Sequence, residues 1–149
     1  MIDLRAYLSP RRVVDLASRG KDGAIMELVA VAAESPAVED AEKLQDAVFE
    51  REGIMSTGIG LGIAIPHAKI PSIRDFVVVI GRAPGGLDFN ALDQKPVTIV
   101  VLIAGPSQEQ QRYLEILAAV TLRLKSEEVR RAVLAAPTPA AVVDVLARS

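Results

Sequence analysis

The chain has 149 residues, of which half are apolar and about a quarter charged, so it is long enough to form one domain with a buried core. Its formal net charge is −2 with acids and bases interspersed, which argues against a basic surface for nucleic acid or anionic membranes. The absence of cysteine and the presence of one histidine exclude disulfides and the common zinc sites.

Membrane and secretory segments are also not expected. The longest strongly apolar run, residues 97–105, is far shorter than the ~18 residues that a membrane span requires. Charges at Asp3 and Arg5 interrupt the N-terminus, where a signal peptide needs an apolar stretch. We therefore expect a soluble cytoplasmic protein with a single domain over residues 1–149.

Two helices are predicted in the first third of the chain. The first spans residues 22–35, with Asp22 as its N-cap. The second spans residues 35–53, where Ser35 is the expected N-cap and Pro36 occupies the first helical position, in which proline is favoured.

The second helix carries an apolar stripe with spacings of three and four residues, formed by Val38, Ala41, Leu44 and Val48. Gly53 ends the helix. Arg51 continues the stripe at its next step. A charged residue in this position either extends past the apolar surface into solvent or points at a site.

Three strands follow. The first is the short apolar stretch IAIPH at residues 63–67. Residues 75–83 and 96–105 are nearly continuous runs of β-branched and aliphatic side chains, which are typical of strands covered on both faces.

Three helices are predicted in the last third of the chain. Ser107 and Gln110 form a capping box that opens the first helix. Its expected apolar stripe is Leu114, Leu117, Ala118, Thr121 and Leu124. Ser126 and Thr138 cap two shorter helices. The order of elements implies a single α/β domain, with a small mixed β-sheet sandwiched by helices on both faces, but it does not reveal the strand order.

The segment STGIGLGIAIPHAKI, residues 56–70, has three alternating glycines before the chain's only histidine. A dinucleotide-binding turn does not fit, because Ile63 stands where the third glycine is required and a strand-like segment follows in place of a helix. A phosphate-binding P-loop does not fit either, because its lysine–serine pair is absent. We therefore expect no cofactor and no metal.

The segment nevertheless suits a phosphoryl group. Glycines let the backbone approach a ligand closely, and hydroxyl and N–H groups hold anions. The candidate phosphoryl-binding residues are Ser56, Thr57, Gly58 and Gly60. Pro66 ends the strand, so His67 is expected beside this loop at the solvent boundary.

A lone histidine is more often structural than catalytic, but this context favours a nucleophile. A neutral imidazole, with an ordinary pKa of ~6.5, can accept a phosphoryl group covalently. Phosphoryl transfer then requires positive charge near the phosphoryl oxygens, which Arg51 is placed to supply to His67.

The segment REGIMSTGIGLGIAIPHAK, residues 51–69, resembles the signature of enzyme IIA of the bacterial phosphoenolpyruvate-dependent sugar phosphotransferase system, fructose–mannitol class. Within it, STGIG.GIAIPH is most similar to the nitrogen-regulatory member, and the similarity extends to FNALDQKPV at residues 89–97. The resemblance implies an α/β domain with a mixed sheet. It also implies that His67 takes a phosphoryl group from a small histidine phosphocarrier protein, with Arg51 beside it. The acceptor is then a downstream phosphotransferase domain or a regulated protein.

One position departs from the family pattern. The family usually has a second histidine early in the helix after the strand VTIVVLIAG, and alignment of that helix puts Tyr113 there. A tyrosine can donate a hydrogen bond to a phosphoryl oxygen but cannot carry positive charge. Tyr113 is thus either a site residue or an aromatic residue at its rim.

Three functions follow from these observations. The first is a phosphohistidine carrier with a regulatory output of the nitrogen or potassium type, favoured because no transporter-linked domain or membrane segment is present in the chain. The second is a sugar-uptake enzyme IIA that passes the phosphoryl group to a transporter-linked domain. The third is an interaction module that keeps the fold but is not phosphorylated, for which the missing second histidine is the best argument.

Overall fold

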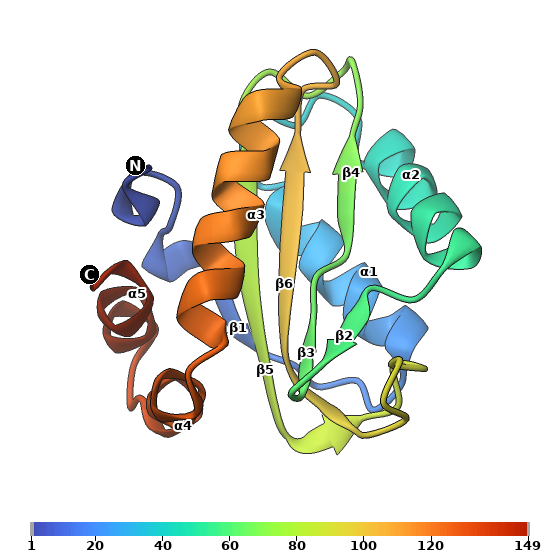
Figure 1. Ribbon diagram of the computed structural model, residues 1–149. Helices are drawn as coiled ribbons and strands as arrows, with labels where there is room; N and C mark the ends of the chain where they lie inside the picture. The colour runs from blue at the N-terminus through green and yellow to red at the C-terminus, as the bar shows by residue number, and fades with distance from the viewer. Residues whose placement is uncertain (1, 149) are drawn as a thin grey trace.

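The computed structural model describes residues 2–148, and over this range six strands form one mixed sheet between two layers of helices (Figure 1). The strands are β1 (Val13–Asp15), β2 (Gly58–Gly60), β3 (Ile63–Ala64), β4 (His67–Lys69), β5 (Val77–Leu87) and β6 (Val97–Gly105). The α-helices are α1 (Lys21–Ala32), α2 (Ala41–Ile54), α3 (Gln110–Leu124), α4 (Glu127–Ala135) and α5 (Pro139–Ala147). Two 3₁₀-helices, η1 (Leu4–Ala6) and η2 (Pro10–Arg12), precede β1.

The strand order is β1-β5-β6-β3-β2, and β4 also pairs with β6. The central pair β5–β6 is antiparallel, whereas β1 runs parallel to β5, and β3 and β4 run parallel to β6. The strand predicted at 63–67 is therefore two short strands on the same edge of β6. They are separated at Pro66, which has no N–H to donate to the ladder. His67 is the first residue of β4 and lies opposite Ile103.

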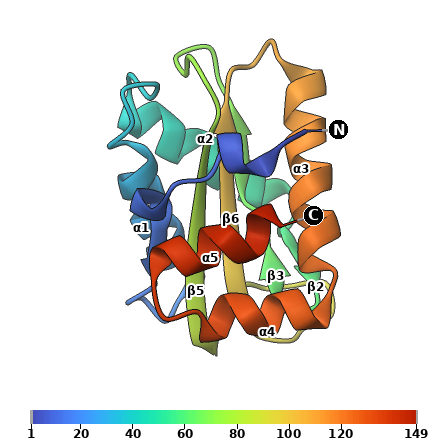
Figure 2. The same cartoon turned by 90° about the vertical axis from the view of Figure 1, so that its left-hand side faces the viewer.

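Both faces of the sheet are covered, as the continuous apolar strands predicted (Figure 2). Helices α1 and α2 pack on one face, where Leu28 and Leu44 meet Leu102 of β6. Helices α3, α4 and α5 pack on the other, where Ile116 meets Ile103. Alternate residues of β6 thus enter opposite cores, and the expected single α/β domain with a helix-sandwiched mixed sheet is confirmed.

The predicted start of the second helix is wrong. Helix α2 begins at Ala41, where the side chain of Asp40 is the N-cap and accepts a hydrogen bond from the third helical N–H at 3.1 Å. Ser35 and Pro36 instead open a turn, because Val38 forms a bridge to the segment after β4. This long-range pairing prevents the chain from becoming helical earlier.

Helix α1 also begins differently from the prediction. Its N-cap is Gly20, and Asp22 lies within the first turn rather than before it. The carboxylate of Asp22 remains near the positive end of the helix dipole, which is favourable without a capping hydrogen bond.

The predicted capping box of α3 is wrong, and its predicted apolar stripe is right only in part, since Leu124 is buried and Leu117 is partly buried against the core. No side chain caps this helix, whose N-cap is Glu109, and Ser107 does not take that role. The buried residues are Tyr113, Ile116, Val120 and Leu124, whereas Leu114 is 49% exposed. Over its first three turns, the buried face of the helix therefore lies about one residue before the predicted one.

The caps of the last two helices are confirmed. Ser126 accepts a hydrogen bond from the N–H of Val129 at 3.3 Å, and Thr138 accepts one from the N–H of Ala141 at 3.1 Å. Strands β1 and β2 were not predicted, because segments of three residues carry too little periodicity to be recognised.

Candidate functional site

The candidate site lies where the end of α2, the start of β4 and the first turn of α3 meet. Arg51 lies in the last turn of α2, His67 begins β4, and Tyr113 lies near the start of α3. The imidazole and phenol rings have centroids 5.4 Å apart and are tilted by 42°. Three elements far apart in the sequence thus bring together the three side chains that sequence analysis singled out.

The imidazole of His67 is half-buried and held in one tautomer. Its Nδ1 lies 3.0 Å from the backbone carbonyl oxygen of Ile65. A carbonyl oxygen only accepts hydrogen bonds, so Nδ1 carries the proton. Nε2 is therefore left with a free lone pair, which is the form of imidazole that can act as a nucleophile.

The surroundings of His67 keep it neutral near pH 7. Burial lowers its pKa below the ordinary value and is the largest influence, partly opposed by the hydrogen bond to Ile65. The positive charges of Arg51 and Lys69 lower the pKa further, whereas the negative charge of Glu52 raises it. The net lowering favours the uncharged, nucleophilic ring.

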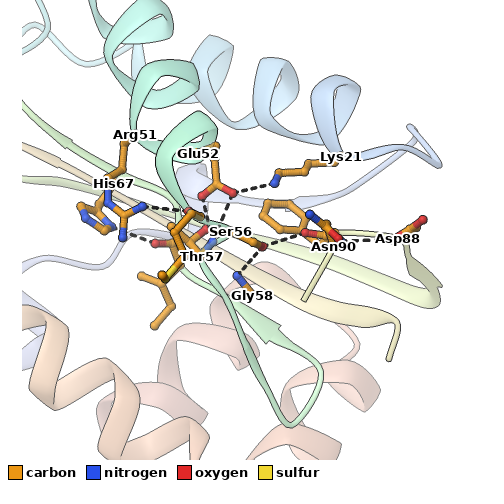
Figure 3. A network of polar contacts seen from close by, with 12 residues as sticks. Lys21, Arg51, Glu52, Ser56, Thr57, Gly58, His67, Asp88 and Asn90 are labelled. Carbon is orange, nitrogen blue, oxygen red and sulfur yellow. Dashed lines mark hydrogen bonds and ion pairs between the residues drawn. The ribbon is translucent and has the colours of Figure 1, made fainter. Parts of the chain in front are cut away.

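Arg51 is oriented by the loop that follows its helix. Its Nη1 donates a hydrogen bond to the backbone carbonyl of Met55 at 2.8 Å, and its guanidinium lies beside His67 (Figure 3). Burial lowers the pKa of His67 and raises that of Tyr113, and the positive charge of Arg51 acts in the lowering direction on both. The guanidinium is thus close enough to act on both rings.

Tyr113 belongs to the core rather than to the rim, since it is only 4% exposed. Burial raises the pKa of its phenol, so the hydroxyl stays protonated and can donate a hydrogen bond. The ammonium of Lys69 lies 4.6 Å from the centroid of the Tyr113 ring, and it also hydrogen-bonds Gln110. Sequence analysis missed Lys69, although a residue two positions after His67 on a strand points to the same side.

Glu52 is a second residue that sequence analysis missed. The buried stripe of α2 continues from Val48 to Glu52, not to Arg51, which is half-buried at its edge. The side chain of Glu52 is 4% exposed and forms an ion pair with Lys21 of α1 at 2.9 Å. The i, i+4 spacing from Leu44 through Val48 to Glu52 was the available signal.

The glycine-rich segment forms the β2–β3 hairpin. Leu61 and Gly62 make its turn with φ angles of 60° and 76°, which suits a two-residue hairpin turn. Gly58 leaves no room for a side chain, because a Cβ there would lie 2.8 Å from that of Ala91. These glycines therefore have structural roles in the hairpin.

The hairpin leads away from the imidazole. Gly58 pairs with Ala64 and Gly60 with Ile63, three and four residues before His67. At ~3.3 Å per residue, these positions are separated from His67 by roughly 10 to 13 Å along the strand. A phosphoryl-binding role for Gly58 and Gly60 stays a prediction.

Ser56 and Thr57 already have hydrogen-bond partners in the loop and in neighbouring segments. The hydroxyl of Ser56 donates to the carbonyl of Phe89 at 2.8 Å and accepts from the N–H of Gly58 at 3.1 Å (Figure 3). The N–H of Thr57 donates to Glu52. The buried hydroxyl of Thr57 has no hydrogen-bond partner within residues 2–148. A phosphoryl-binding role for these two residues likewise stays a prediction.

Two further observations bear on the kind of site. The residues that the structure describes include no group of three or more potential metal ligands. No helix in this part of the chain has the length and apolar character needed to cross a membrane.

Comparisons with known proteins identify the family. A family model described as "Phosphoenolpyruvate-dependent sugar phosphotransferase system, EIIA 2" matches residues 8–149. The chain is 39% identical over 127 residues to the fructose-specific EIIA component of Haloferax volcanii, a match that covers 85% of this chain and 82% of that protein. It is 30% identical over 148 residues to the nitrogen regulatory protein of Pseudomonas aeruginosa, with 98% and 96% covered.

Solved structures share the fold. The nitrogen regulatory protein IIA-Ntr of Neisseria meningitidis superposes with a TM-score of 0.89 over 96% of this chain and 98% of that one, at 22% identity. The mannitol enzyme IIA of Escherichia coli, solved in complex with phosphorylated enzyme IIB, superposes with a TM-score of 0.81 at 21% identity, over 94% of this chain and 96% of that one. The chain therefore belongs to the EIIA type 2 family, the phosphohistidine-carrying proteins of the phosphoenolpyruvate-dependent phosphotransferase system.

Proposed function

We propose that His67 receives a phosphoryl group on Nε2 from a small phosphocarrier protein and passes it to an acceptor protein. The observation that carries this proposal is the tautomer of His67. This imidazole, from the only histidine of the sequence, has Nδ1 bonded to Ile65 and therefore has its free lone pair on Nε2.

The transfer balances without any added reagent. The Nε2 lone pair of His67 forms a bond to phosphorus, while the nitrogen–phosphorus bond of the donor breaks and the donor imidazole keeps that electron pair. The proton on Nδ1 stays in its hydrogen bond to Ile65, and this carbonyl stabilises the positive charge that the phosphorylated ring acquires. In the onward transfer the same steps run in reverse.

Arg51 and Tyr113 stabilise the phosphoryl group. A guanidinium can donate two hydrogen bonds to phosphoryl oxygens, and the phenol of Tyr113 can donate one. The rings of Tyr113 and His67 have centroids 5.4 Å apart, and the charge of Arg51 acts on His67. Ser56, Thr57, Gly58 and Gly60 are proposed as secondary phosphoryl-binding residues, although the N–H groups of Thr57 and Gly58 would first have to leave Glu52 and Ser56.

Two destinations for the phosphoryl group are supported by different observations. The similarity of STGIG.GIAIPH to the nitrogen-regulatory member, and near full-length similarity to the Pseudomonas protein, favour a regulatory output. The higher identity to the Haloferax protein favours transfer to an enzyme IIB domain of fructose uptake. In both cases the partners are proteins that meet the chain at the His67 site.

Intact-mass measurement tests the proposal. The protein is incubated with phosphoenolpyruvate and the general donor proteins of the system, and the gain of one phosphoryl group is followed. We expect an adduct that is labile in acid and stable in alkali, as a phosphoramidate is, and no adduct in His67→Ala. An adduct on that variant would refute the assignment, and its absence from the wild-type protein would leave only the interaction module.

The same phosphorylated protein separates the two destinations. It is mixed with a fructose-specific enzyme IIB domain, and loss of its phosphoryl group is measured by mass. Rapid transfer to that domain supports sugar uptake. Retention of the phosphoryl group supports the regulatory output.

A further inference from the structure

Glu52 is a buried carboxylate that the proposed chemistry does not use. Both of its carboxylate oxygens accept the backbone N–H of Thr57, each at 3.2 Å, and one of them also pairs with the ammonium of Lys21 at 2.9 Å (Figure 3). The ammonium lies 5.0 Å from the centroid of the Phe89 ring. Burial of a carboxylate is unfavourable unless it is paired and hydrogen-bonded. Here Glu52, on α2, links Lys21 of α1 to Thr57 in the loop after α2.

The contacts continue from Glu52 to His67. The carbonyl of Thr57 accepts the N–H of Ile65 at 3.0 Å. The carbonyl of Ile65 in turn accepts Nδ1–H of His67 at 3.0 Å. The position of Thr57 therefore determines where the carbonyl that selects the tautomer of His67 lies.

A second branch leads from the same loop to the guanidinium. Met55, two residues before Thr57, provides the carbonyl to which Arg51 donates at 2.8 Å. Anchoring Thr57 thus restrains the part of the chain that orients both His67 and Arg51.

We propose that Glu52, with Lys21 as its counter-ion, is a positioning residue that holds His67 in the Nδ1–H tautomer and so presents Nε2 for phosphoryl transfer. This inference rests on the proposed function of His67. The essential feature is the acceptor oxygen offered to Thr57, not the negative charge, because only the hydrogen bond restrains the loop.

Two double variants separate this role from a purely structural ion pair. Lys21→Met with Glu52→Met removes both charges and the acceptor, and apolar replacement of a buried ion pair usually preserves folding. Lys21→Met with Glu52→Gln has the same net charge and nearly the same shape, but it keeps an oxygen that can accept the N–H of Thr57. The two variants therefore carry the same charge and differ at one terminal group, an amide with an acceptor oxygen in one and a thioether in the other.

The tautomer is measured by nitrogen-15 NMR of the imidazole in the unphosphorylated protein, and the phosphorylation rate by intact mass. In the wild-type protein and the Gln variant, we expect the Nδ1–H tautomer and rates within about three-fold of each other. In the Met variant, we expect a mixture of tautomers and a rate roughly five- to ten-fold lower, the effect of one lost hydrogen bond.

Equal tautomer populations and equal rates in the two folded double variants would overturn the proposal. If the Met variant does not fold, a shift away from the wild-type tautomer in the Gln variant would overturn it instead. The NMR result does not depend on phosphorylation, so a wild-type protein that accepts no phosphoryl group would refute the function of His67 while the positioning of its ring is still tested.

Discussion

The pKa of His67 can be measured and links the pH to the stability of the folded protein. Burial is the main cause of its lowered pKa, so an NMR titration of the ring should give a midpoint below the ordinary value of ~6.5. Above this pH both the folded and unfolded chains hold a neutral ring. As the pH falls through ~6.5, the unfolded chain binds a proton first, and the folded protein loses stability.

Urea unfolding at a series of pH values, with His67→Gln as the comparison, measures this effect. The free energy of unfolding of the wild-type protein should fall relative to that of the variant between about pH 7.5 and pH 5. A relative gain of the wild-type protein in acid would mean that its folded-state pKa is raised.

Arg51 should affect transfer far more than folding. Charge-assisted hydrogen bonds are worth ~1.5–3 kcal/mol, so Arg51→Gln should slow phosphorylation by roughly ten- to a hundred-fold. Its hydrogen bond to Met55 is at the surface, and the free energy of unfolding should change by less than about 1 kcal/mol. Normal transfer combined with a large loss of stability would show that Arg51 is structural.

Tyr113 places a neutral group beside His67, where an imidazole could carry charge. Tyr113→His should speed phosphoryl exchange with the donor protein by about ten-fold, since an added charged donor at a transfer site is worth up to a hundred-fold or more. Tyr113→Phe removes only the hydroxyl and should change the rate by about three-fold. An unchanged rate in Tyr113→His, measured by rapid quench and intact mass, would exclude contact with the phosphoryl group.

At the scale of elements, the β2–β3 hairpin depends on the packing of Gly58 against the loop before β6. A Cβ at Gly58 would lie 2.8 Å from the Cβ of Ala91 and 2.9 Å from its Cα. The carbonyl of Gly58 also accepts a hydrogen bond from the N–H of Leu92 at 3.1 Å. Gly58→Ala should therefore lower the free energy of unfolding by about 1–3 kcal/mol.

Gly53→Ala is the matched control, because nothing lies within 4 Å of its added Cβ. In helix α2 this substitution should raise the stability by up to about 1 kcal/mol. Urea denaturation measures both variants. If Gly58→Ala had the same free energy of unfolding as Gly53→Ala, the hairpin would be able to move away from Ala91 without loss of stability.

At the scale of the whole molecule, Arg82 joins the sheet to the C-terminal helices. Its Nε pairs with Asp15 of β1 at 2.8 Å, and its Nη1 donates to the carbonyls of Val133 at 3.0 Å and Ala136 at 2.7 Å. Arg82→Met leaves these carbonyls without their donor. The free energy of unfolding should fall by about 1–3 kcal/mol.

The control for this prediction is Arg131→Met, which breaks a surface ion pair with Glu127 and should change stability by less than about 0.5 kcal/mol. Thermal unfolding measures both variants. Arg82 lies opposite Ile99, four residues along β6 from the partner of His67, so phosphorylation by the donor proteins should stay normal below the melting temperature. Slowed phosphorylation of the folded Arg82→Met variant would show that the contacts of Arg82 also affect the His67 site.

Several elements could be predicted from residues that are close together in the sequence. The runs at the start of β5 and along β6 are apolar at successive positions and rich in β-branched residues, which is typical of a strand covered on both faces. Ser126 and Thr138 cap their helices through bonds that span three residues. His67, Arg51 and Tyr113 were identified from residue type, spacing and family resemblance, and the fold brings them together.

The tertiary structure alone decided the features that depend on distant partners. Val38 pairs with Ile73, and α2 therefore begins later in the chain than predicted. The buried face of α3 is the one on which Ile116 packs against the sheet. The strand order, the burial of Glu52 against Lys21 and the tautomer of His67 likewise arise from contacts between separate segments. Such contacts leave no periodic signal in a local stretch of sequence, because their energy depends on two parts of the chain that only folding brings together.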